Sequence, residues 1–236
     1  TEIEQVRRTV GRTPEVMVKV LTRGAVTPSQ VRQHADYIGR AGDLALETDD
    51  GQRLTGEDAS SRLVEDWDLD LPVAGSAERV ARGGCRDARL VHKLILSMPP
   101  GTPSEKVLGA VRDFAREEFG LTHRYAMALH TDEPHPHVHL LVKAVSEQGE
   151  RLNIRKETLR RWRAGFAEQL RARGVAANAT ERAVRGQSKT ALTDGIYRAA
   201  ERGESTHLRD RLRTAADAIA TGARMPPDAG ARRLHD

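Results

Sequence analysis

The sequence predicts an α+β domain in which helices flank a central, largely antiparallel β-sheet. Short apolar runs of strand length recur along the chain, and amphipathic runs with the period of a helix separate them. The last two predicted strands, 124–130 and 137–143, are joined only by a short loop. The 236 residues are enough to bury a core without disulfide support, and the single Cys85 excludes an internal disulfide.

The first third of the chain supplies a strand, a helix and a hairpin. Residues 1–13 form a polar lead-in, and the run VMVKVL at 16–21 predicts a buried strand. In the segment TPSQ, Thr27 and Gln30 fit the two positions of a capping box, so a helix should begin there and end at the turn GRAG. The acidic stretch that follows predicts a short strand or hairpin and then a small helix that ends near Trp67.

The rest of the chain continues the pattern. After a surface connection rich in Pro and Gly at 70–88, the run RLVHKLILS at 89–97 is a strong strand candidate. Thr102 and Glu105 fit a second capping box, at the start of a helix that Gly120 terminates. Beyond the last strand we expect a helix at 152–174, one or two helices within 187–221, and a disordered tail.

Charge is segregated along the chain although the net charge is only +4. Residues 43–70 hold ten acidic and two basic side chains, whereas residues 151–173 hold eight basic and two acidic ones. The basic segment could face a polyanion. Our candidates for DNA contacts there are Arg155, Lys156, Arg160 and Arg163.

Four of the nine histidines fall within ten positions, from His130 to His139. Because alternate side chains of a strand share a face, His137 and His139 point the same way, and His130 on the neighbouring strand can reach them. Three neutral imidazoles with open positions describe a catalytic site for a divalent metal ion. Asp132 is placed to orient an imidazole or to take a proton.

This cluster resembles the third motif of plasmid-mobilisation relaxases, in the superfamily of His-hydrophobic-His endonucleases. The similarity is strongest to the branch that includes the T-DNA border endonucleases. Two earlier segments are similar to the nucleophile motif and the second motif of that branch, in the same order: YIGRAGDLALE from Tyr37, and HKLILSMPPG, whose serine is Ser97. The resemblance covers residues 14–187, which we expect to be the nuclease domain.

The resemblance implies a reaction and a site. Tyr37 would attack a phosphate at an origin of transfer, form a 5′-phosphotyrosine and leave a free 3′ hydroxyl. His130, His137 and His139 would hold Mg²⁺ or Mn²⁺, with Asp132 and Ser97 beside the substrate. Further expected contacts are His135, with substrate or with a metal ligand, and Arg40 and Lys143, with DNA. Lys143 stands where the family often has an asparagine.

Partners and location also follow from the resemblance. Single-stranded DNA at an origin of transfer is the expected substrate, with accessory relaxosome proteins and a type IV secretion coupling protein as further partners. No signal peptide or membrane span is recognisable, so we expect a bacterial cytoplasmic protein, exported to a recipient cell when it is attached to DNA. The remaining segments are a lead-in at 1–13, a helical extension at 188–225 and a disordered tail at 226–236.

The same residues also fit three different functions. The segment HPHVH matches a histidine-triad nucleotide hydrolase, in which His137 would accept the phosphoryl group without a metal. A DNA-binding module without catalysis and a replication initiator of the same superfamily are the second and third. Of the three tyrosines, Tyr125 should face away from His130, and Tyr197 lies beyond the region of resemblance, which leaves Tyr37 as the nucleophile.

Overall fold

The computed structural model describes residues 2–21, 24–69, 89–180, 202–203 and 206–221. The chain divides into two compact units, Thr1–Ala179 and Thr180–Asp236. The second unit contains helix α8 (Thr206–Thr221). Three features discussed above lie outside the described residues: the expected tail, Tyr197 and the connection at 70–88. Within the described part, no helix has the length and apolar character needed to cross a membrane.

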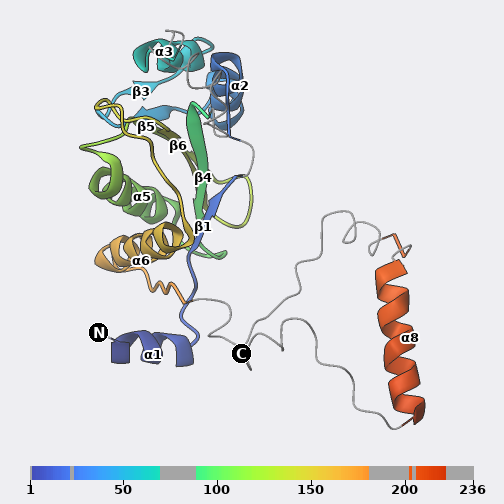
Figure 1. Ribbon diagram of the computed structural model, residues 1–236. Coiled ribbons are helices and arrows are strands. Elements are labelled where there is room, and N and C mark those ends of the chain that lie inside the picture. Colours follow the sequence, from blue (N-terminus) through green and yellow to red (C-terminus); the bar gives the residue numbers. More distant parts are fainter. Residues whose placement is uncertain (1, 22–23, 70–88, 181–201, 204–205, 222–236) are drawn as a thin grey trace. The chain divides into compact units, whose positions relative to one another are not determined.

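The first unit is built on a six-stranded sheet whose neighbouring strands all run antiparallel, in the order β1-β4-β6-β5-β2-β3 (Figure 1). This confirms the predicted fold class. The strands are β1 (Met17–Val20), β2 (Leu46–Thr48), β3 (Arg53–Leu54), β4 (Val91–Ser97), β5 (Tyr125–His130) and β6 (His137–Lys143). The helices of this unit are α1 (Glu2–Val10), α2 (Pro28–Ile38), α3 (Ala59–Asp66), α5 (Ser104–Phe119) and α6 (Lys156–Ala172).

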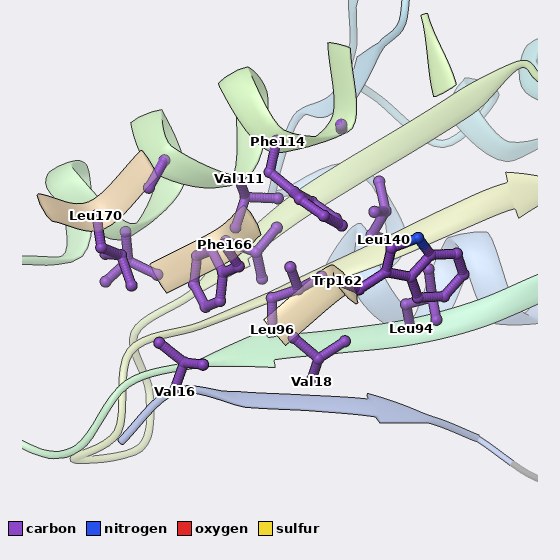
Figure 2. Packing of buried hydrophobic residues seen from close by; sticks show 14 of the residues in the cluster. Val16, Val18, Leu94, Leu96, Val111, Phe114, Leu140, Trp162, Phe166 and Leu170 are labelled. Atoms are coloured by element: carbon purple, nitrogen blue, oxygen red, sulfur yellow. The ribbon is translucent and has the colours of Figure 1, made fainter. Parts of the chain in front are cut away.

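One face of the sheet carries large apolar side chains and packs against α5 and α6, which lie side by side in Figure 1. Figure 2 shows Phe114 of α5 and Trp162 and Phe166 of α6 packed together with Leu96 and Leu140 of the sheet. The apolar stripes of both helices account for this packing, because their buried residues recur every three or four positions.

The other face of the sheet carries smaller side chains on β5 and packs against α2 and α3. Ala126, Ala128 and Leu141 meet a second cluster of buried residues, which includes Ala35 and Ile38 of α2. Small alanines on the strand let α2 approach the sheet closely. This face also carries the histidines, so the position of α2 decides what lies beside them.

The helix α2 begins as predicted. Thr27 Oγ1 accepts a hydrogen bond from the Gln30 amide at 3.3 Å, while the Gln30 side chain accepts one from the Val26 amide at 2.9 Å, one residue before the cap. The predicted capping box at Thr102 is wrong. The helix starts at Ser104 after an extended Pro103, one residue later than a cap at Thr102 requires, and the Thr102 hydroxyl donates to the Pro99 carbonyl at 2.9 Å.

Three other details differ from the sequence prediction. The polar lead-in contains a helix, α1, and α6 begins at Lys156 instead of near residue 152. Strand β1 lies at the edge of the sheet and is not fully buried, since the Met17 side chain is 43% exposed while Val18 is buried. β1 is therefore an edge strand with one face open to solvent.

Candidate active site

Three imidazoles converge on the face of the sheet that α2 covers. The pairing of β5 with β6 sets His130 directly opposite His137, and His139 lies two residues further along β6. The ring centroids are 4.6 Å apart for His130 and His139, 5.2 Å for His130 and His137, and 5.3 Å for His137 and His139. One nitrogen from each ring lies within 4.8 Å of the other two. Strand alternation thus brings the predicted trio together.

Backbone carbonyls fix the ring nitrogens of two of these histidines. His130 Nε2 lies 2.7 Å from the Ile38 carbonyl, and His137 Nδ1 lies 3.0 Å from the His135 carbonyl. A carbonyl only accepts, so each of these nitrogens donates its proton and the neutral ring keeps its other nitrogen bare. His130 Nδ1 and His137 Nε2 therefore carry no proton and can act as ligand atoms, although His130 Nδ1 accepts a hydrogen bond from Arg40 Nη2 at 3.5 Å.

The third histidine is buried and lacks a hydrogen bond at one nitrogen. Among the described residues, none hydrogen-bonds His139 Nδ1. Burial, and then the neighbouring His130, lower the pKa of His139 to about 3, and burial also lowers the pKa of His130. Both rings are therefore neutral at physiological pH, which is the state that binds metals. The three residues fit a divalent metal ion.

Tyr37 lies beside this trio. It occupies the last turn of α2, and its side chain is 56% exposed. The centroid of its ring is 6.1 Å from that of His139 and 6.5 Å from that of His130. His34, one turn earlier on the same helix, stacks on Tyr37 with 5.9 Å between ring centroids and 22° between planes. The phenol is both accessible and held against the histidines.

A tight turn after α2 places Arg40 at the centre of the site. Arg40 and Ala41 have positive φ angles of 50° and 53°, and Gly42 follows with a φ of 98°. A Cβ atom at Gly42 would overlap the backbone of Gly56, so this turn requires glycine. Positive φ at residues other than glycine costs free energy and occurs where surrounding contacts hold it.

The guanidinium of Arg40 links three groups of the site. It forms an ion pair with Asp132, lies 5.6 Å from the Tyr37 ring centroid, and places Nη2 3.5 Å from His130 Nδ1. Asp132 was predicted to orient an imidazole or to accept a proton. Here its carboxylate holds Arg40, so any orienting effect on His130 acts through the guanidinium.

Two further predicted residues lie close by. Ser97 is buried and pairs with His137 across β4 and β6, on the same face as the trio. His135 is exposed, and its backbone carbonyl, not its ring, contacts His137.

The other predicted DNA contacts lie away from the histidine trio. Lys143 is at the opposite end of β6 from His137 and pairs with Glu147, with 2.9 Å between Nζ and Oε1. Arg155 precedes α6, and Lys156, Arg160 and Arg163 belong to α6, whose buried residues pack on the other side of the sheet. These residues can therefore touch only nucleic acid that extends beyond the histidine trio.

Sequence reasoning missed two features of the site. Residues three apart on a helix share a flank, as His34 and Tyr37 do, but this spacing does not show that their rings stack. The contact of His130 with the Ile38 carbonyl carried no signal in the sequence, because any residue at position 38 would offer the same carbonyl.

The sequence of this chain is similar to those of known nuclease domains. The family described as "Relaxase: MobA/VirD2-like, nuclease domain" matches residues 73–175. The T-DNA border endonuclease VirD2 of Agrobacterium fabrum is 26% identical over 214 residues, which are 83% of this chain and 46% of that protein. Residues 73–175 of this chain thus match a relaxase nuclease domain, and the chain resembles the T-DNA border endonucleases.

Two other matches point to the same domain type. The 43 kDa relaxation protein of Salmonella typhimurium is 29% identical over 134 residues, 51% of this chain and 32% of that protein. The Mn-bound crystal structure of the MobM relaxase domain with plasmid pMV158 oriT DNA has the same fold, with a TM-score of 0.51 and 14% identity over 79% of this chain and 98% of that one. Similarity to relaxase domains is therefore found both in sequence and in fold. This chain spans about half the length of the VirD2 relatives.

Proposed function

We propose that this relaxase nicks and rejoins one strand of DNA at an origin of transfer by transesterification on Tyr37. The observation that carries the proposal is the position of an accessible phenol beside three converging imidazoles. In such a reaction the Tyr37 oxygen forms a bond to phosphorus while the bond from phosphorus to the 3′ oxygen breaks. The products are a 5′-phosphotyrosine and a free 3′ hydroxyl. Because one ester replaces another, the reverse reaction can reseal the strand.

The side chains around Tyr37 have separate tasks in this proposal. Arg40 stabilises negative charge on the phenolic oxygen and on the phosphate as the bond forms. Asp132 holds Arg40 in place and is our candidate to accept the phenolic proton. Ser97, next to His137, donates a hydroxyl hydrogen bond to the bound phosphate. His34 and the histidine rings restrict the phenol to one side of the site.

The trio His130, His137 and His139 would hold a divalent cation. When bound, such a cation neutralises charge on the phosphoryl oxygens and stabilises the leaving 3′ oxygen. We propose Mg²⁺ or Mn²⁺, and three nitrogen ligands favour Mn²⁺ of the two, since Mg²⁺ prefers oxygen ligands. Hydrogen bonds from His130 and His137 to backbone carbonyls keep the rings in the ligating tautomers.

The wider assignments remain proposals. We propose single-stranded DNA as substrate, accessory relaxosome proteins and a type IV secretion coupling protein as partners, and export from the bacterial cytoplasm with the attached strand. The proposed nuclease domain covers 14–187. Further DNA contacts proposed beyond the histidine trio are His135, Lys143, Arg155, Lys156, Arg160 and Arg163.

A covalent-adduct assay tests the reaction. The protein is incubated with Mn²⁺ and a labelled single-stranded oligonucleotide from the transfer origin of the element that encodes it, and adducts are separated on a denaturing gel. Tyr37→Phe should abolish the adduct. Tyr125→Phe is the matched control, because Tyr125 is buried in the core on the opposite face, and it should leave the adduct intact. An adduct that survives Tyr37→Phe would refute the proposal.

The histidine-triad hydrolase remains the competing enzymatic function. It would use His137 as the phosphoryl acceptor and would leave Tyr37, Arg40 and Asp132 without a role. Chelation separates the two functions, since it should stop a relaxase and leave a histidine-triad hydrolase active.

A further inference from the structure

The face of the sheet that holds the histidines continues onto the two strands on the β1 side. The register places Met17, Ser97, His137 and His130 in one row across β1, β4, β6 and β5. The adjacent row on the same face contains Lys19, Ile95, His139 and Ala128. Lys19 therefore shares a row with His139, two strands away, at a backbone distance of about 10 Å.

A second lysine on this face lies nearer to the histidines. Lys93 is two residues from Ile95 on β4 and pairs with Leu141 of β6. Its backbone is therefore about 7 Å along the strand from the row of His139. Burial, and then the charge of Lys93, lower the pKa of His34 to about 4.

Neither Lys19 nor Lys93 forms an ion pair with an acidic side chain among the described residues. Several arginines of this domain, in contrast, form such ion pairs. Arg112 pairs with Glu47, Arg124 with Asp49, and Arg173 with Asp113. Lys93 is half-buried, and burial lowers its pKa. A half-buried cation without a counter-charge is unfavourable, and an anionic ligand would remove that cost.

Apolar surface lies next to these two cations. Met17 is 43% exposed although it stands beside buried Ser97 in the row of His137. Ile95, between Lys19 and His139, is partly exposed. Cations flanking apolar side chains suit a nucleic acid strand, whose phosphates need positive charge and whose bases need a flat apolar contact.

We propose that Lys93 and Lys19 bind the DNA phosphate adjacent to the one that Tyr37 attacks, so that the substrate strand crosses β4 and β1 with a base over Met17. This inference rests on the proposed nicking function and adds the path of the strand. It places the strand on the histidine face, away from α6. The two lysines position the substrate and take no part in bond making.

Binding measurements test the path. Dissociation constants for the labelled origin oligonucleotide are measured at several salt concentrations for Lys93→Gln, Lys19→Gln and the double variant, all in a Tyr37→Phe background that blocks adduct formation. Lys106→Gln is the matched control, since Lys106 is exposed on α5. Each of the two substitutions should reduce the slope of log affinity against log salt by about 0.7, and the control should not change it.

Oligonucleotides in which a single phosphate is replaced by a neutral methylphosphonate show which phosphate the lysines bind. If the lysines bind the phosphate adjacent to the nick on one side, replacing that phosphate should weaken DNA binding to the parent protein. The same replacement should have little further effect on DNA binding to the double lysine variant. Additive losses at the flanking phosphates on both sides, or an equal effect of Lys106→Gln, would overturn the proposal.

Adduct formation by proteins that keep Tyr37 distinguishes a failure of the proposed nicking function from a failure of the proposed strand path. A wild-type protein that forms no adduct with Mn²⁺ refutes the nicking function. A wild type that forms the adduct, with lysine variants that keep the full salt slope, refutes only the strand path. Mn²⁺ affinity should be the same in all lysine variants, which verifies that the histidine trio is intact.

Discussion

His130 Nε2 lies 2.7 Å from the backbone carbonyl of Ile38, the residue that follows Tyr37. Carbonyls in the last turn of a helix lack a partner within the helix, and His130 supplies one for α2. The same bond leaves His130 Nδ1 without a proton, so that this nitrogen accepts from Arg40 Nη2 at 3.5 Å. A single hydrogen bond therefore connects one ring of the histidine trio on β5 to the end of the helix that carries Tyr37.

This bond predicts that two histidine variants differ in stability. His130→Ala and His137→Ala should both lose Mn²⁺ affinity by at least tenfold, because each removes one of three ligands. Without metal, however, His130→Ala should be less stable than His137→Ala by about 1–3 kcal/mol, because only His130 bonds the buried end of α2. Urea unfolding in the presence of a chelator gives the comparison, and equal stabilities would contradict the proposed tie.

The stacked ring of His34 should act on the rate of adduct formation alone. His34→Ala should slow the single-turnover rate about tenfold, since the phenol loses the ring that holds it, while affinities for DNA and Mn²⁺ stay unchanged. His34→Phe keeps an aromatic ring and should restore most of the rate. If the Phe variant is as slow as the Ala variant, stacking is not the role of His34.

The turn at Gly42 should be essential for both fold and activity. Gly42→Ala forces a Cβ atom onto the Gly56 backbone at a positive φ, so we expect a loss of more than about 2 kcal/mol in stability and displacement of Arg40. Gly51→Ala is the control, because Gly51 also has a positive φ of 85° but has nothing within 4 Å of its Cβ position. It should cost about 1 kcal/mol and leave adduct formation unchanged. Thermal or urea unfolding with the adduct assay measures both effects.

Buried neutral histidines should make the metal-free protein less stable as pH falls. The pKa of His139 is about 3 in the folded protein and that of an unfolded histidine about 6.5. Below pH 6.5 the unfolded chain therefore binds a proton that the folded chain does not, so stability drops toward acid. Between pH 7 and 5 this histidine alone accounts for about 2 kcal/mol.

The matching variant isolates that effect. His139→Asn should flatten the fall in unfolding free energy over the same pH range, measured with a chelator present. A fall as steep as in the wild type would show that other groups cause it.

Residue patterns were sufficient to predict much of this site. Alternation along β5 and β6 predicted that His130, His137 and His139 share a face, and the capping box at Thr27 predicted the helix that carries Tyr37. The first of these arguments depends on period alone, which tertiary contacts seldom change. The Thr102 capping box failed because the helix begins one residue later, with an extended Pro103 as its cap residue.

Features that depend on contacts between distant elements were not predictable. The ion pair of Arg40 with Asp132 needs a turn with positive φ at Arg40 and Ala41, which the sequence letters there do not indicate. Likewise, only the register of β1 with β4 shows that Lys19 lies in the row of His139. Single-strand patterns contain no information on register between strands.

The most direct test of the central claim is peptide mapping of the covalent product. After reaction of the wild-type protein with the origin oligonucleotide and Mn²⁺, nuclease and protease digestion should leave a nucleotide mass on the peptide that contains Tyr37, bonded through a 5′ phosphate. A nucleotide attached to His137 or to another side chain, with an unmodified Tyr37 peptide, would contradict the account.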